Sequence, residues 1–139
     1  MGQAKQKRAA ILHMEAAKLQ LADKLEEALT LYTQALELDP QNAGILSNLG
    51  TLHQRCGRLD KSLHCFKLAH RLNPSPANKC NIGAALAGQD RHEEAASIYE
   101  EVLRIDPFNT TAQYYLGLVR FKQGRMAEGW AGYEYRHQT

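Results

Sequence analysis

Hydrophobic residues recur with helical spacing along most of the chain, in short runs that turn-forming residues separate. Apolar positions three or four residues apart predict one buried face for each helix. Pro40, Pro74 and Pro107 close successive runs and stand 34 and 33 residues apart. Because proline pushes the preceding residue out of the α region, each one predicts a helix end. A fixed period of this length predicts stacked helix-turn-helix repeats, and therefore an all-α solenoid.

Three further kinds of position recur when the segments are aligned on their prolines. Glycine in a helix interior costs about 1 kcal/mol relative to alanine, so its recurrence at one phase predicts close helix approach. A small residue and, one turn later on the same face, an aromatic ring recur in the second helix of each pair. We interpret all of them as packing positions and not as a cofactor site: Gly50, Gly83, Gly117; Ala28, Ser62, Ala95, Gly129; Tyr32, Phe66, Tyr99, Tyr133.

Short polar segments separate the helices inside each predicted pair. Gly57-Arg58, Asp90-Arg91 and Gly124-Arg125 are typical of tight turns. Carboxylates follow each turn, where they favour the start of the next helix. Asp60, Glu93-Glu94 and Glu128 occupy these positions.

The whole pattern resembles the tetratricopeptide repeat, whose Leu-Gly, small, aromatic and proline positions recur here from about residue 9 to 136. The resemblance implies a right-handed solenoid of about four antiparallel repeats, at 9–42, 43–75, 76–109 and an incomplete 110–139. Residues 1–8 form a basic arm before this single repeat domain. The first repeat departs from the family pattern because Glu15-Ala16 replaces Leu-Gly. The family's tryptophan position in each first helix holds Leu12, Leu46, Lys79 and Gln113.

Charge and composition exclude several functions. The chain has 139 residues with 17 basic and 15 acidic ones, so its net charge of +2 creates no general field for nucleic acid. Lys5, Lys7 and Arg8 form a small basic cluster, which we interpret as a solvated tail or helical extension in preference to a phosphate-binding arm. No window approaches the roughly 20 apolar residues of a membrane span, and the N-terminal apolar stretch is short for a signal peptide. We therefore expect a cytoplasmic protein.

No arrangement of nucleophiles, bases or metal ligands suggests catalysis. Cys56, Cys65 and Cys80 lack paired spacing and are interpreted as free thiols in a reducing compartment. The six histidines show no spacing typical of metal ligands. Phosphate-binding loops and serine nucleophile motifs are absent from the sequence. We predict a protein that is not an enzyme and uses no cofactor or metal.

The resemblance implies that the first helix of each pair lines a concave groove that binds an extended segment of a partner protein. In the first repeat the groove positions are His13, Met14 and Ala17. In the later repeats the predicted peptide-binding residues are Ser47, Asn48, Thr51, Arg55, Asn81, Tyr114, Tyr115 and Lys122. Phe121 either adds to an aromatic end of this groove or, as we expect, is buried.

Asn48 and Asn81 occupy the same position in successive repeats. A carboxamide both donates and accepts hydrogen bonds, so it can pair with a peptide backbone. Helices stack about 8–10 Å apart and an extended peptide rises about 3.3 Å per residue, so two such residues would contact roughly every third peptide residue. This arrangement is similar to the asparagine ladder of some family members, including the repeat arm of O-GlcNAc transferases. The alternative is that both are ordinary exposed or capping residues.

The sequence matches a second binding mode of the family, the clamping of acidic chaperone tails, less well. Family members that clamp the acidic C-terminal tails of heat-shock chaperones use a constellation of Lys, Asn and Arg on their first helices. The matching positions here carry His13 and Ala17, and the later ones carry Ala77 or Thr111 in place of a cation. Only the asparagine position is retained, so we do not expect a chaperone-tail clamp.

The last repeat carries large apolar residues with no later helix in the sequence to cover them. Trp130, Tyr133 and Tyr135 either pack back onto the preceding helices, form a contact between two copies, or continue into a longer protein. The segment 128–136 is similar to the last repeat of bacterial proteins in which such an array precedes a glycosyltransferase-like domain. Three hypotheses follow: a non-enzymatic interaction module, the substrate-recognition arm of a larger glycosyltransferase-like protein, and a self-assembling scaffold.

Overall fold

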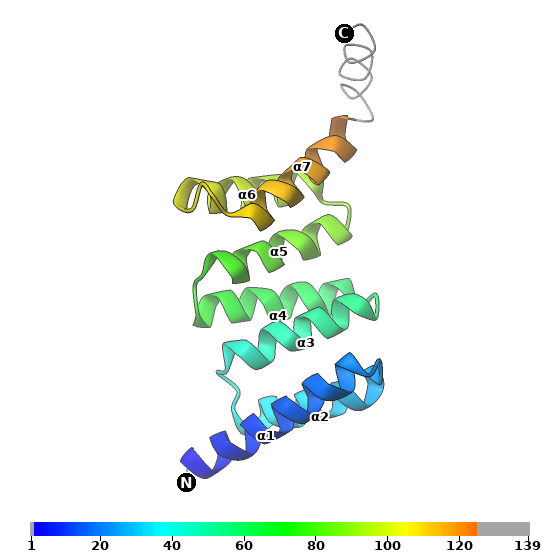
Figure 1. The fold of residues 1–139 in the computed structure, drawn as a ribbon, viewed down its shortest axis with the longest axis vertical. Coiled ribbons are helices and arrows are strands. Elements are labelled where there is room, and N and C mark those ends of the chain that lie inside the picture. The colour runs from blue at the N-terminus through cyan, green and yellow to red at the C-terminus, as the bar shows by residue number, and fades with distance from the viewer. Residues whose placement is uncertain (1, 125–139) are drawn as a thin grey trace, which may run out of the picture. The chain divides into compact units, whose positions relative to one another are not determined.

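The computed structural model describes residues 2–124, which form α-helices and no strand (Figure 1). The prediction of an all-α helical-repeat fold is confirmed. The helices divide between two compact units, Met1–Asn78 and Lys79–Thr139, with the boundary in the first turn of α5. The helices are α1 (Gly2–Leu21), α2 (Leu25–Leu38), α3 (Ala43–Arg55), α4 (Leu59–Leu72), α5 (Pro76–Gly88), α6 (His92–Ile105) and α7 (Thr110–Gly124).

The prolines end the second helix of each pair, as predicted. Helices α2, α4 and α6 each stop two residues before a proline. The intervening residue leaves the helical conformation, with φ between −132° and −141°, while its N–H still donates to the carbonyl four residues earlier. Helix termination therefore follows from proline's restriction of its neighbour.

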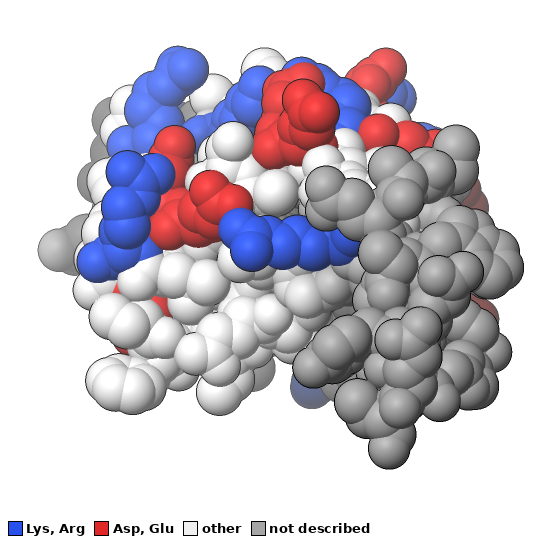
Figure 2. Space-filling model, turned by 90° about the horizontal axis from the view of Figure 1, so that it is seen from above, with Lys and Arg blue, Asp and Glu red and all other residues white. Residues whose placement is uncertain are grey.

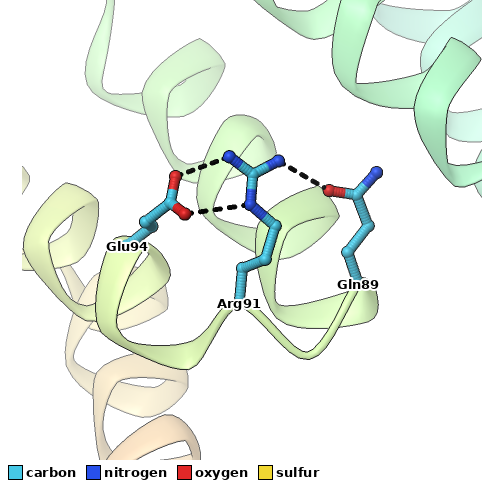
Figure 3. Close-up of polar contacts among 3 residues, drawn as sticks. All are labelled: Gln89, Arg91 and Glu94. Carbon is cyan, nitrogen blue, oxygen red and sulfur yellow. Dashed lines mark hydrogen bonds and ion pairs between the residues drawn. The ribbon is translucent and has the colours of Figure 1, made fainter.

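Left-handed residues reverse the chain inside each pair. Asp23, Gly57 and Asp90 have φ values of 63°, 77° and 61°, in the turns after α1, α3 and α5. Glycine and aspartate reach this region more easily than most residues do. At the α5–α6 turn, Arg91 donates from Nε and Nη2 to both carboxylate oxygens of Glu94, at 3.0 and 2.6 Å, and from Nη1 to Gln89 Oε1 at 3.0 Å (Figure 3). These contacts hold the turn from its exposed side.

A second periodic signal lies at the start of the first helices. The side-chain oxygens of Asn42, Ser75 and Asn109 accept hydrogen bonds from backbone N–H groups three residues later, at 2.9–3.1 Å. Each cap stabilises its helix by about 1 kcal/mol. The caps are 33 and 34 residues apart, the reverse of the proline spacings, because the linker after Pro74 is one residue shorter.

Gly50, Gly83 and the described rings pack as predicted. A Cβ added to Gly50 would lie 2.6 Å from the Phe66 ring, and one added to Gly83 would lie 2.7 Å from the Tyr99 ring. No described atom lies within 4 Å of the equivalent position at Gly117. The small residues Ala28, Ser62 and Ala95 are fully buried, as are the rings one turn later, Tyr32, Phe66 and Tyr99, which are at most 1% exposed. Gly129 and Tyr133 lie outside the described residues.

Helix α1 begins at Gly2, so the basic cluster lies within the first turns of this helix. Lys5, Lys7 and Arg8 are all exposed. Among the described residues, no helix combines the length and apolar character that a membrane crossing needs.

Candidate functional site

Helix α3 carries four of the predicted peptide-binding residues on successive turns of unit 1. Ser47, Asn48 and Thr51 are half-buried, and Arg55 is exposed. The structure gives each of these side chains a contact inside the unit. This part of the predicted groove is therefore a row of polar groups that already contact neighbouring residues.

Asn48 joins α3 to α1 through a histidine. Its Nδ2 donates to His13 Nε2 at 2.6 Å. Burial lowers the pKa of His13, which favours the neutral ring that this contact requires. The His13 ring also meets the Tyr32 ring edge-on, with centroids 5.8 Å apart, and the Tyr32 hydroxyl donates to Gln20 Oε1. The amide is thus held by a chain of contacts that runs into the core of unit 1.

Ser47 is braced by an asparagine that sequence reasoning missed. The Ser47 hydroxyl donates to Asn78 Oδ1 at 3.0 Å. The Asn78 Nδ2 donates in turn to the carbonyls of Asn73 and Ala69, at 2.8 and 3.5 Å. Asn78 is only 9% exposed, and these hydrogen bonds give both ends of its buried amide a partner. This residue connects the start of α5 to α3 and α4 and has a structural role.

The other two side chains on α3 have weaker constraints. The Thr51 hydroxyl donates to the Ser47 carbonyl one turn earlier, at 3.1 Å. Arg55 pairs with Asp23 at 3.0 Å, but the two side chains are 45% and 77% exposed. An exposed ion pair contributes little to stability, so Arg55 can exchange this partner for another carboxylate at small cost.

The predicted binding residues of unit 2 lie on α5 and α7. Asn81 is half-buried on α5, while Tyr114, Tyr115 and Lys122 are exposed on α7. The Tyr115 ring stacks on the buried Tyr99 ring at 5.9 Å, and Tyr114 meets Tyr115 edge-on at 5.2 Å. The structure therefore brings the two tyrosines together into an aromatic surface. The register between Asn48 and Asn81, which belong to different units, stays a prediction.

One prediction for α7 is wrong. Phe121, which we expected to be buried, is 59% exposed. The buried residues of α7 are Ala112 and Val119, and Phe121 lies about 200° around the helix from Val119.

The predicted self-association residues Trp130, Tyr133 and Tyr135 lie outside the described part of the chain.

An ion pair occupies the family's tryptophan position in the third repeat. Lys79 Nζ contacts Glu101 Oε2, and the two side chains are 23% and 41% exposed. This hydrogen bond holds the pKa of Glu101 below its usual value.

On the face shown in Figure 2, basic and acidic side chains lie next to one another, so neither sign dominates its described surface.

The three cysteines are buried or half-buried. Cys56, Cys65 and Cys80 are free thiols, and burial raises the pKa of Cys65 and Cys80. Within residues 2–124, no three His, Cys, Asp or Glu side chains are placed to hold a metal ion. The polar features of the described region are thus hydrogen-bonding surfaces on first helices.

These surfaces, on paired helices with a 33–34-residue period, define a helical-repeat protein. A family profile described as "TPR repeat" matches residues 22–57, and profiles described as "Tetratricopeptide repeat" match residues 43–76 and 80–136. The chain belongs to the tetratricopeptide repeat family.

Similar proteins include receptors and peptide-bound repeat domains. The peroxisomal targeting signal receptor of Candida albicans is 34% identical over 93 residues, covering 63% of this chain and 16% of the receptor. The corresponding receptor of Saccharomyces cerevisiae is 33% identical over 122 residues, covering 87% of this chain and 18% of the receptor. The chain thus spans less than a fifth of these relatives.

Among solved structures, the first tetratricopeptide domain of Spaghetti (RPAP3), bound to the HSP90 peptide SRMEEVD, superposes with a TM-score of 0.79. It is 26% identical, and the match covers 86% of this chain and 95% of that domain. The glycosyltransferase-like and bacterial features that the last repeat suggested stay predictions.

Proposed function

We propose that this chain is a non-enzymatic interaction module that binds an extended segment of a partner protein along its first helices. The proposal is supported by membership of the tetratricopeptide repeat family and by the peptide in the RPAP3 structure. In it, Asn48 and Asn81 contact the peptide backbone, and Arg55, Tyr115 and Lys122 select among side chains. We also propose a cytoplasmic location.

The observation that carries the proposal is the unused half of the Asn48 amide. Its Nδ2 is taken up by His13, whereas Oδ1 accepts no hydrogen bond from the described residues. The hydroxyls of Ser47 and Thr51 donate inside the unit and retain oxygen lone pairs. This row therefore offers acceptors to backbone N–H groups, which an extended peptide presents on alternating sides.

Direct peptide titration tests the proposal. The probes are SRMEEVD, which the RPAP3 domain binds, a peptide ending in Ser-Lys-Leu, a C-terminal peroxisomal address, and an array of random extended peptides. We expect binding that the double substitution Asn48→Ala/Asn81→Ala weakens, measured at a temperature at which circular dichroism shows the variant folded, because losing the Asn48–His13 contact also lowers the thermal midpoint. Gln34→Ala, which removes an exposed amide from α2, is the matched control and should bind as the original chain does.

Two outcomes would contradict the proposal in different ways. If the double variant binds with the same affinity as the original chain, the asparagine ladder is refuted, while groove binding by other residues stays possible. Absence of binding to every probe, including the random array, would refute peptide recognition itself. Preferential binding of SRMEEVD would overturn our expectation that the missing cations exclude a chaperone-tail clamp.

Two further roles rest on residues 128–136, which lie outside the described structure. One is the substrate-recognition arm of a larger glycosyltransferase-like protein of bacterial type. The other is a scaffold that assembles with copies of itself through Trp130, Tyr133 and Tyr135. The mass of the chain in solution separates the second from the main proposal, because Trp130→Ala should then convert an oligomer to a monomer.

A further inference from the structure

The contact between His13 and Asn48 couples the protonation of the ring to the orientation of the amide. A carboxamide nitrogen only donates hydrogen bonds, so the nitrogen that faces it must accept. With Asn48 Nδ2 placed 2.6 Å from His13 Nε2, the contact is a hydrogen bond only in the tautomer whose Nε2 carries no proton. The neutral ring then carries its proton on Nδ1. This tautomer holds the amide with Nδ2 toward α1 and leaves Oδ1 for other partners.

Uncharged groups surround the histidine on both neighbouring helices. From α2 it faces the ring of Tyr32, a phenol whose pKa is raised by burial and whose hydroxyl donates to Gln20. From α3 it faces Asn48 and Gly44, where an added Cβ would lie 3.7 Å from His13 Cε1. Burial lowers the pKa of His13.

We propose that His13 is a positioning residue that sets which end of the Asn48 amide a bound peptide meets, and so makes binding pH-dependent. The inference rests on the proposed peptide-binding function. A proton added to Nε2 places two donors against each other, which the Asn48 amide relieves by turning over. Oδ1 then accepts from Nε2–H, and Nδ2 takes the place of Oδ1 at the peptide.

The reversal changes what the groove recognises at this position. Above the pKa of His13, Asn48 offers an acceptor to a peptide N–H. Below it, the same position offers a donor, so that N–H faces another donor and loses its hydrogen bond. We expect binding of an uncharged peptide to be about tenfold weaker once His13 is protonated than at pH 7.5, the scale of one hydrogen bond.

Nuclear magnetic resonance of the peptide-free chain tests the positioning directly. At pH 7.5 we expect the His13 tautomer protonated on Nδ1, and the side-chain amide signals of Asn48 should shift with the titration of His13. His13→Gln should abolish that shift. His64→Gln, at an exposed histidine of α4, is the matched control and should preserve it. A proton on Nε2 of the neutral ring, or Asn48 signals that ignore the titration, would overturn the proposal.

A second measurement tests the consequence for binding. The probe is the uncharged peptide Ser-Gln-Met-Gln-Gln-Val-Asn with blocked termini, titrated between pH 5 and 7.5. The original chain and His64→Gln should lose affinity on acidification, whereas His13→Gln should show a flat profile. Binding that stays constant through the titration of His13, as the resonance experiment measures it, contradicts the pH dependence. If this probe fails to bind at every pH, the peptide-binding function fails for it while the resonance experiment still decides the role of His13.

Discussion

Replacing Gly50 by alanine should destabilise unit 1 by about 2 kcal/mol. The added Cβ would lie 2.6, 2.8 and 3.1 Å from three atoms of the Phe66 ring, roughly 1 Å closer than the 3.5–4.0 Å of ordinary carbon contacts. Phe66 is 1% exposed, so its ring has no open space into which to move. Overpacking of this kind costs up to about 3 kcal/mol, and alanine recovers about 1 kcal/mol of helix propensity.

A double-mutant cycle separates the clash from the propensity. In a Phe66→Leu background the ring is gone, so Gly50→Ala should become stabilising by about 1 kcal/mol. Urea unfolding followed by circular dichroism at 222 nm measures all four chains, with the midpoint compared at constant slope. Gly83→Ala, against Tyr99, should repeat the effect in unit 2 because the approach there is 2.7 Å. A neutral Gly50→Ala, or a cost that persists without the ring, would refute the reasoning.

Three other predictions follow from buried or capping polar groups. Burial and the nearby Lys61 and Arg58 lower the pKa of His53, so on acidification the unfolded chain binds a proton at this histidine before the folded chain does. The free energy of unfolding should therefore stay constant above about pH 6.5 and fall below it. An unchanged urea midpoint in acid would contradict this. Asn109→Ala should cost about 1 kcal/mol by uncapping α7, whereas Asn109→Ser should be nearly neutral in thermal unfolding. Asn78→Ala should cost about 1–3 kcal/mol, and a cycle with Ser47→Ala that shows no coupling would argue against their hydrogen bond.

Features with a local physical cause were predictable from the sequence. Proline ends a helix through its own ring, and a helical glycine favours close approach of a neighbour, so the ends of α2, α4 and α6 and the packing at Gly50 and Gly83 followed directly. The caps at Asn42, Ser75 and Asn109 carry an equally local signal. That signal was available in the sequence as a second 33–34-residue period.

Contacts between helices were not predictable in the same way. The partners Ser47 and Asn78 are 31 residues apart, and Asn48 and His13 are 35 apart, so each pairing depends on rotamers and helix packing. Hydrophobicity alone also misplaced Phe121, because it does not say which side of α7 a residue occupies. The predicted groove residues were therefore chosen by position, while their existing partners emerged only from the structure.

The ion pair between Lys79 and Glu101 gives the third repeat a sensitivity that an aromatic wedge would lack. Salt screens the attraction between two charges but leaves apolar burial largely intact. Dissolved ions therefore act on the contact between α5 and α6 more strongly than on a hydrophobic contact in the same position. The stability of the contact between α5 and α6 therefore depends on ionic strength as well as on the sequence.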